Sequence, residues 1–200
     1  MLEKNAITAT PIHDLLNRRW SPRAFDKSKA VSRAQINALI EAARWAPSCN
    51  GDEPWRYLVW NRADDATGWQ KAFECLGEGN RKWCENVPVL MLSCAGSVFS
   101  HNGKPNRYTQ HDTGMASVSL SLQAVALGLA AHVQPQAEGL DPQVGLRQQP
   151  VRRAGEQLEF QFVHRQRLAA PLDGADVQRQ FDAGPLGLDL AAEQIGRAHV

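Results

Sequence analysis

The segment from Asp112 to Leu129 constrains the fold most, because it is the longest stretch of this 200-residue chain with one persistent period. Alanines at 116, 124, 126, 130 and 131 widen its apolar arc. A helix that is apolar over a wide arc is either central in its domain or packed against a partner. We therefore expect a helix over 112–129 in one of these two positions. Its predicted buried face carries large residues at helical spacing, namely Met115, Val118, Leu122, Val125 and Leu129.

Two helices are predicted ahead of this segment. Thr10 is a plausible N-cap and Pro11 suits the first helical position, so a helix should begin there and end near Arg19. Residues Ser32–Gln35 have the pattern of a capping box, which predicts a second helix ending near Trp45.

Strands are predicted where apolar and branched residues cluster. Residues 56–60 read as a strand, and 87–92 read as a buried strand with Pro88 at its start. Residues 158–163 could form a further strand. Between the first two lies a polar, helix-like stretch whose apolar side is Trp69, Phe73 and Leu76.

Composition and charge exclude several classes of function. The formal net charge is +1, which does not favour nucleic acid or an anionic membrane as the main partner. No apolar stretch reaches the ~20 residues that a transmembrane helix requires. The first residues lack a basic stretch followed by an apolar run, so we expect no signal peptide and a cytoplasmic protein.

The cysteines and histidines favour neither a disulfide framework nor a metal site. No C-x-x-C pair occurs, so reduced, mostly buried thiols are expected. His101, His111 and Asp112 could be drawn as a metal cluster, but they flank a loop rich in Gly, Asn and Pro, which favours a surface loop. The four cysteines are Cys49, Cys75, Cys84 and Cys94.

The chain changes character after about Val133. Eleven glutamines fall in the last 67 residues, against four in the first 133. This change is typical of a polar, partly disordered tail, and it is equally typical of a GC-rich gene read out of frame. Residues 195–200 match one reading frame of a common sequencing-library adapter, which predicts a processing scar. We therefore expect three parts: 1–133, a doubtful segment 134–194, and the scar 195–200.

The loop after the first helix concentrates positive charge. Arg18, Arg19 and Arg23 lie within six residues of one another, together with the Ser21 hydroxyl, on a loop fixed by Pro22. Guanidinium groups match phosphate oxygens in forked geometry, so the loop could grip a phosphate. A solvated basic helix end that complements the helix dipole is the alternative.

A second loop follows the helix that ends near Trp45. Residues 46–55 read Ala-Pro-Ser-Cys-Asn-Gly-Asp-Glu-Pro-Trp and lead into the strand at 56–60. Small side chains with exposed amides can approach a planar ligand and hydrogen bond to its edge. On its own, the segment could equally be a simple helix-to-strand connection.

The two loops together resemble the nitroreductase family over about residues 12–133. The family opens with R-R-S-x-R-x-[FY] and continues with A-P-S-x-x-N-x-Q-P-W and a D-x-G-x-A helix. Trp20 stands where the family often has Arg or His, Glu53 replaces its Gln, and Gly51 takes the place of its Asn. The matching positions are Arg19, Ser21, Arg23 and Phe25, then Ala46, Pro47, Ser48, Pro54 and Trp55, and then residues 112–116 with the apolar helix that follows.

The resemblance implies an α+β fold, with a mostly antiparallel sheet surrounded by helices, in a homodimer that binds FMN at the subunit interface. Arg19 and Ser21 would contact the phosphate and ribityl chain, and Arg23 the N1/O2 edge of the flavin. The loop from Ser48 to Gly51 would reach the flavin of the other subunit. The full predicted set is Arg19, Trp20, Ser21, Arg23, Pro47, Ser48, Cys49, Asn50, Gly51, Asn80 and Lys82.

By the same resemblance, the chain would pass electrons from NAD(P)H through FMN to a small acceptor such as a nitroaromatic or quinone. No side chain is assigned as a catalytic acid, and no metal ligand is predicted. The rival interpretation is a truncated or frameshifted, non-enzymatic fragment that cannot dimerise or hold FMN, because the family's later strand and closing basic segment are not found in 134–194.

Overall fold

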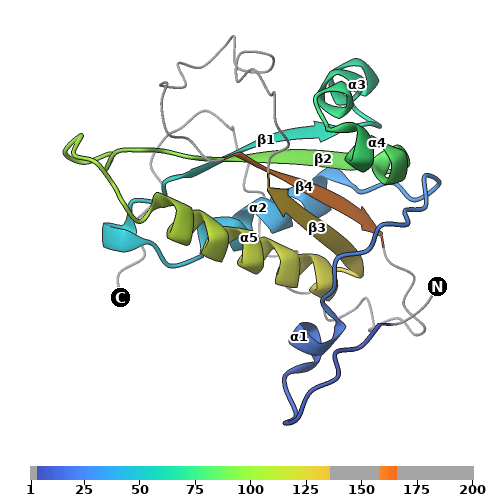
Figure 1. Cartoon of the computed structure of the whole chain (residues 1–200), viewed down its shortest axis with the longest axis horizontal. Coiled ribbons are helices and arrows are strands. Elements are labelled where there is room, and N and C mark those ends of the chain that lie inside the picture. Colours follow the sequence, from blue (N-terminus) through green and yellow to red (C-terminus); the bar gives the residue numbers. More distant parts are fainter. Residues whose placement is uncertain (1–3, 136–157, 166–200) are drawn as a thin grey trace. The chain divides into compact units, whose positions relative to one another are not determined.

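A computed structural model describes residues 4–135 and 158–165. The chain divides into two compact units, 1–166 and 167–200, and every described residue lies in the first. Its centre is a four-stranded antiparallel sheet in the order β1-β2-β4-β3 (Figure 1). The strands are β1 (Trp55–Asn61), β2 (Val89–Ala95), β3 (Leu129–Pro135) and β4 (Leu158–Arg165). The predicted strand over 158–163 is therefore confirmed, and β4 lies between β2 and β3.

Strand alternation divides the apolar core into two layers. On one face, Trp55, Val89 and Met91 pack with α2 (Arg33–Arg44) and α5 (Thr109–Ala126). On the other, Leu90 and Leu92 pack with α3 (Ala66–Glu74) and α4 (Glu78–Cys84). Successive strand residues point to opposite faces, so odd and even positions of β2 serve different layers. All seven residues of β2 are buried, which confirms the predicted buried strand.

The predicted start is confirmed for the second helix and wrong for the first. Ser32 caps α2 with the predicted capping box, and the Gln35 side chain completes it. The first helix, α1 (Asp14–Arg18), begins later than Thr10 and Pro11 predict, because the His13 side chain caps it by accepting from the Leu15 amide. The helix-like stretch with Trp69 is confirmed as α3.

The prediction for the longest helix was wrong about its end and only partly right about its buried face, since Val125 and Leu129 are buried but Val118 is not. α5 ends at Ala126, and Gly128, with a φ of 67°, turns the chain into β3. The buried side combines small and polar residues, including Ala116, Ser117 and Ala124, with the large apolar Leu120 and Val125, whereas Val118 is 55% exposed. Small side chains let α5 approach α2 and the sheet closely around the fully buried Leu120. Of the two predicted positions, central or packed on a partner, the structure shows the central one, and Val118 of the predicted stripe stays on the surface.

The four thiols are free, and their surroundings differ. Cys84 and Cys94 are buried, whereas Cys49 and Cys75 are half-buried. Burial raises the pKa of the Cys84 thiol to about 12, so this thiol stays protonated and unreactive near neutral pH. No helix in the described part of the chain has both the length and the apolar character needed to cross a bilayer.

The α2 layer provides a stability test. Leu39 is fully buried against the sheet, so Leu39→Ala should lower the free energy of unfolding by about 2–5 kcal/mol, as cavity-forming substitutions do. Urea unfolding followed by circular dichroism measures it. Asn37→Ala, an exposed change on the same helix, is the control and should stay within about 0.5 kcal/mol. Equal effects of the two changes would contradict the assigned burial.

Candidate functional site: two loops at opposite ends of the sheet

The basic loop after α1 presents two cations without carboxylate partners. Arg18 forms an ion pair with Asp14, with 2.7 Å between Nε and Oδ2. Arg19, Ser21 and Arg23 are exposed, and no carboxylate among the described residues pairs with either of these arginines. The loop therefore offers two guanidinium groups and a hydroxyl to an anion, the donor set that phosphate oxygens favour.

Aromatic packing holds this loop against α4. The guanidinium of Arg23 lies 5.9 Å from the ring centre of Trp83, and Phe25 stacks on the same indole at 5.7 Å. Asn80 lies three residues before Trp83, so both share one side of α4. The structure thus brings the predicted Arg23 and the helix carrying Asn80 together. Lys82 is exposed and forms an ion pair with Glu78.

The second loop has an unusual backbone. Asn50, Gly51 and Glu53 have positive φ values of 57°, 61° and 46°, around the short 3-10 helix at Cys49–Gly51. The Ser48 hydroxyl oxygen accepts a hydrogen bond from the Glu53 amide at 3.0 Å. Two consecutive left-handed residues make a compact turn, and such a conformation persists only where the surroundings hold it in place.

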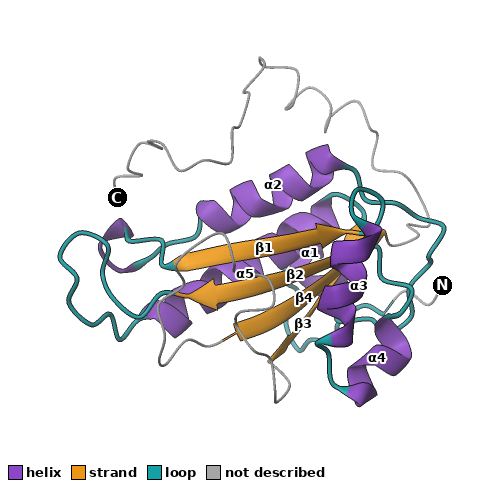
Figure 2. Cartoon of the chain, turned by 90° about the horizontal axis from the view of Figure 1, so that it is seen from above, coloured by secondary structure: helices purple, strands orange, loops and turns teal. Residues whose placement is uncertain are grey.

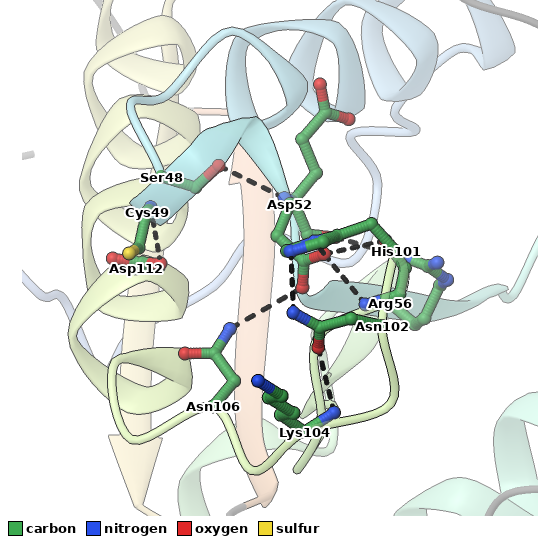
Figure 3. Close-up of polar contacts among 11 residues, drawn as sticks. Ser48, Cys49, Asp52, Arg56, His101, Asn102, Lys104, Asn106 and Asp112 are labelled. Atoms are coloured by element: carbon green, nitrogen blue, oxygen red, sulfur yellow. Dashed lines mark hydrogen bonds and ion pairs between the residues drawn. The ribbon is translucent and has the colours of Figure 1, made fainter.

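Two buried carboxylates provide that support (Figure 3). Asp112, whose side chain is 3% exposed, accepts the Cys49 amide at 2.9 Å from the first turn of α5. Asp52, 2% exposed, accepts the backbone N–H and the hydroxyl of Ser100 at 2.8 Å and 2.6 Å. The Asn106 amide also donates to Asp52, at 3.5 Å. Together they fasten the turn to α5 and to the loop after β2.

The two loops lie at opposite ends of the sheet. Trp55, the first residue of β1, pairs with Ala95, and Asn61, the last, pairs with Val89. The Cys49–Gly51 turn precedes β1 and α4 precedes β2, so they flank opposite ends of this strand pair (Figures 1 and 2). A seven-residue strand spans about 20 Å. Within one chain, the predicted cofactor-binding residues therefore form two separate groups: the basic loop with α4, and the turn before β1.

The described residues contain no group of three His, Cys, Asp or Glu side chains placed to hold a metal ion. The histidines considered as metal ligands instead face the two buried carboxylates separately. His111 lies 3.3 Å from Asp112, and His101 lies 3.8 Å from Asp52. The prediction of a surface loop was wrong for His111 and Asp112, because both lie in the first turn of α5 and Asp112 is buried.

Comparison with known proteins identifies the family. The model of the nitroreductase family matches residues 16–149, which is more than half of the chain. The chain belongs to the nitroreductase family. The architecture agrees: a solved oxidoreductase containing FMN superposes with a TM-score of 0.69 at 26% identity, covering 88% of this chain and 89% of the other. An FMN-dependent nitroreductase from Clostridium difficile R20291 shares the fold, with a TM-score of 0.57, 18% identity, and coverage of 80% and 92%.

Among curated proteins, the similarity is confined to a short stretch. The major NAD(P)H-flavin oxidoreductase of Aliivibrio fischeri is 40% identical over 48 residues, which is 24% of this chain and 22% of that protein. The matches to the curated relatives thus span less than a quarter of each relative's own length. The α+β fold with an antiparallel sheet, predicted from the resemblance, is confirmed by the family and the architecture.

Three residues that hold the nitroreductase loops lie outside the predicted site: Asp52, Asp112 and His132, whose Nδ1 lies 3.0 Å from the carbonyl oxygen of Pro22. Asp112 opens the D-T-G-M-A motif that matches the family, but the motif does not indicate its contact with the Cys49 amide. Asp52 lies inside the second loop motif, and its buried contact with Ser100 spans 48 positions of the chain. No local pattern indicates such a contact.

The Asp52 network predicts a stability effect. Asp52→Ala leaves the Ser100 donors without their acceptor and should lower the free energy of unfolding by about 2 kcal/mol, since hydrogen bonds to charged groups contribute about 1.5–3 kcal/mol. Urea unfolding measures the effect. Glu85→Ala removes an exposed carboxylate and should change stability by less than about 0.5 kcal/mol. If Asp52→Ala were as mild as this control, Asp52 would not be what fastens the loop.

Proposed function

We propose that this nitroreductase-family chain binds FMN and passes electrons from NAD(P)H to small acceptors such as nitroaromatics or quinones. The observation that carries the proposal is the basic loop, where Arg19 and Arg23 have no carboxylate partner among residues 4–135 and lie beside an exposed Ser21 hydroxyl. An exposed pair of cations without counter-charges suits an anionic cofactor. The FMN of the solved oxidoreductase and the NAD(P)H-flavin activity named for the Aliivibrio fischeri relative support it.

The residues present fit the proposed cofactor. Arg19 and Ser21 would hold the phosphate and ribityl chain, and Arg23, packed on Trp83, would supply a fixed cation near the flavin's N1/O2 edge. Bound FMN would supply the redox chemistry, taking electrons from NAD(P)H and releasing them to the acceptor. A cation fixed by aromatic packing stabilises negative charge without reorganising as the charge develops.

We further propose that two copies of the chain complete each site. The turn with Cys49, Asn50 and Gly51 lies about 20 Å from α4 in the same chain, so it would serve the flavin bound by the partner's basic loop, with Pro47 and Ser48 shaping its approach. Val118 on α5 and Trp45 after α2 are 55% and 67% exposed. A second copy would cover such apolar side chains, as in a two-fold symmetric interface.

The first test is cofactor binding by the full 200-residue chain. Purified protein should show a flavin absorption band that NAD(P)H bleaches. Arg19→Ala should weaken FMN binding at least about tenfold, because a charge-assisted hydrogen bond to phosphate is lost. Arg33→Ala, which removes an exposed arginine at the start of α2, should leave the affinity unchanged. A folded, dimeric protein that refuses added FMN would overturn the proposal, and a monomer would favour the fragment interpretation.

A mixing experiment tests the shared site. Arg19→Glu damages the basic loop, and Gly51→Val places a branched residue at a φ of 61°, a conformation that such residues rarely adopt. Each variant alone should bind little FMN. Co-expressed in equal amounts, random pairing puts one intact site in half of the dimers, so about a quarter of all sites should bind FMN. Recovery near zero would mean that one chain supplies both loops to one site.

A further inference from the structure

His132 of β3 is a buried histidine that touches the basic loop. The residue is 6% exposed, and its Nδ1 lies 3.0 Å from the carbonyl oxygen of Pro22, 110 positions away in the sequence. A carbonyl oxygen only accepts hydrogen bonds. The ring must therefore carry its proton on Nδ1 and donate it to the peptide group between Pro22 and Arg23.

The same imidazole packs against α4. The ring centres of His132 and Trp83 are 4.6 Å apart, with an angle of 40° between their planes. Trp83 also lies under Arg23 and Phe25. One strand, one helix and the basic loop thus meet around two rings, and His132 provides a directed hydrogen bond between β3 and the loop.

Burial keeps the ring neutral. Loss of solvent lowers the pKa of His132, and the charge of Arg23 lowers it further, while the Pro22 carbonyl, the Gln134 side chain and the Ser21 backbone oppose this. Arg23 is the charged neighbour on the loop, and the neighbours on α4 and β3, Trp83 and Gln134, carry no charge. Neutral imidazole beside Arg23 avoids burying a second cation there.

We propose that His132 is a positioning residue for the flavin site: its hydrogen bond to the Pro22 carbonyl fixes Ser21 and Arg23 in the geometry that binds FMN. The role in FMN binding rests on the proposed function, whereas the hydrogen bond between His132 and Pro22, the tether, does not. A histidine that only fills the core could be replaced by any ring of similar size. Here the hydrogen-bond acceptor is the carbonyl of Pro22, which lies between Ser21 and Arg23. Loss of the donor would therefore free the basic loop at these two residues.

Three variants separate the tether from simple packing. His132→Phe keeps an aromatic ring and loses the donor, and it should weaken FMN binding about three- to tenfold, the equivalent of one hydrogen bond. His132→Asn retains an N–H donor and should restore most of the affinity. Val133→Ala perturbs β3 on its other face and should leave FMN affinity unchanged. Equal FMN affinity in wild type and His132→Phe would overturn the proposal.

The pH dependence supplies a readout that packing alone would not move. The folded pKa of His132 lies below the ordinary value of 6.5, so the ring is neutral above that pH and takes up a proton on Nε2 as the pH falls through the lowered pKa. The Nδ1–H donor to Pro22 is kept in both forms, so the change is the added charge. The new charge repels Arg23, and FMN affinity should fall more steeply with acidification in wild type than in His132→Asn. The FMN phosphate itself titrates near pH 6, about the value for a phosphate monoester, but equally in both proteins. Parallel pH profiles would mean that the His132 ring does not lie beside Arg23, which contradicts the geometry on which the proposal depends.

Proteolysis of the flavin-free chain distinguishes failure of the tether from failure of the proposed function. Trypsin cleaves after Arg23 when the loop opens, and cleavage tracks the open population. His132→Phe should be cut there about three- to tenfold faster than wild type, with His132→Asn close to wild type. If no variant binds FMN yet this order appears, the tether stands and the cofactor proposal fails. If all are cut at the same rate, the tether does not exist.

Discussion

The burial of β2 on both faces is the constraint on which the described structure depends. Every residue from Val89 to Ala95 is buried, so the strand needs an apolar layer above and below it. α2 and α5 supply one layer and α3 and α4 the other. Because β2 pairs with β1 on one side and β4 on the other, it also fixes which loops emerge at each end of the sheet. The positions of both candidate flavin loops follow from this double burial.

Each loop is held by a polar group buried beside this core. Asp112 and Asp52 accept hydrogen bonds from the second loop and its neighbour, and His132 donates to the basic loop. Buried polar groups are stable only when they are hydrogen bonded, so the core and the loops specify one another. The side chains left for a ligand, Arg19 and Arg23, are by contrast exposed, and no carboxylate in the part of the chain that the structure describes pairs with them. Buried polar groups thus hold the loops in place, and exposed groups on the loops are left to bind a ligand.

α5 links the interior of one chain to a surface that suits a second copy. Its buried side is lined by Ala116, Ser117 and Ala124, which allow close packing, while Val118 remains exposed. The large apolar Leu120 and Val125 are also buried, as expected for the core-facing side of an amphipathic helix. Val118 is the exception, and an exposed apolar side chain on a central helix is what a second copy of the chain would cover in the proposed dimer.

The sequence by itself determined the local features: the capping box at Ser32, the buried strand at β2, the loop chemistry around Arg19 and Ser48, and the family. Each depends on residues a few positions apart, where spacing and side-chain type suffice. Tertiary structure decided which face of α5 is buried, that Leu129 starts a strand, and that Asp52, Asp112 and His132 hold the loops. Leu129 joins a strand because it pairs with Arg165, and the three polar contacts join positions 48 to 110 apart. Such partners cannot be read from neighbouring residues in the sequence.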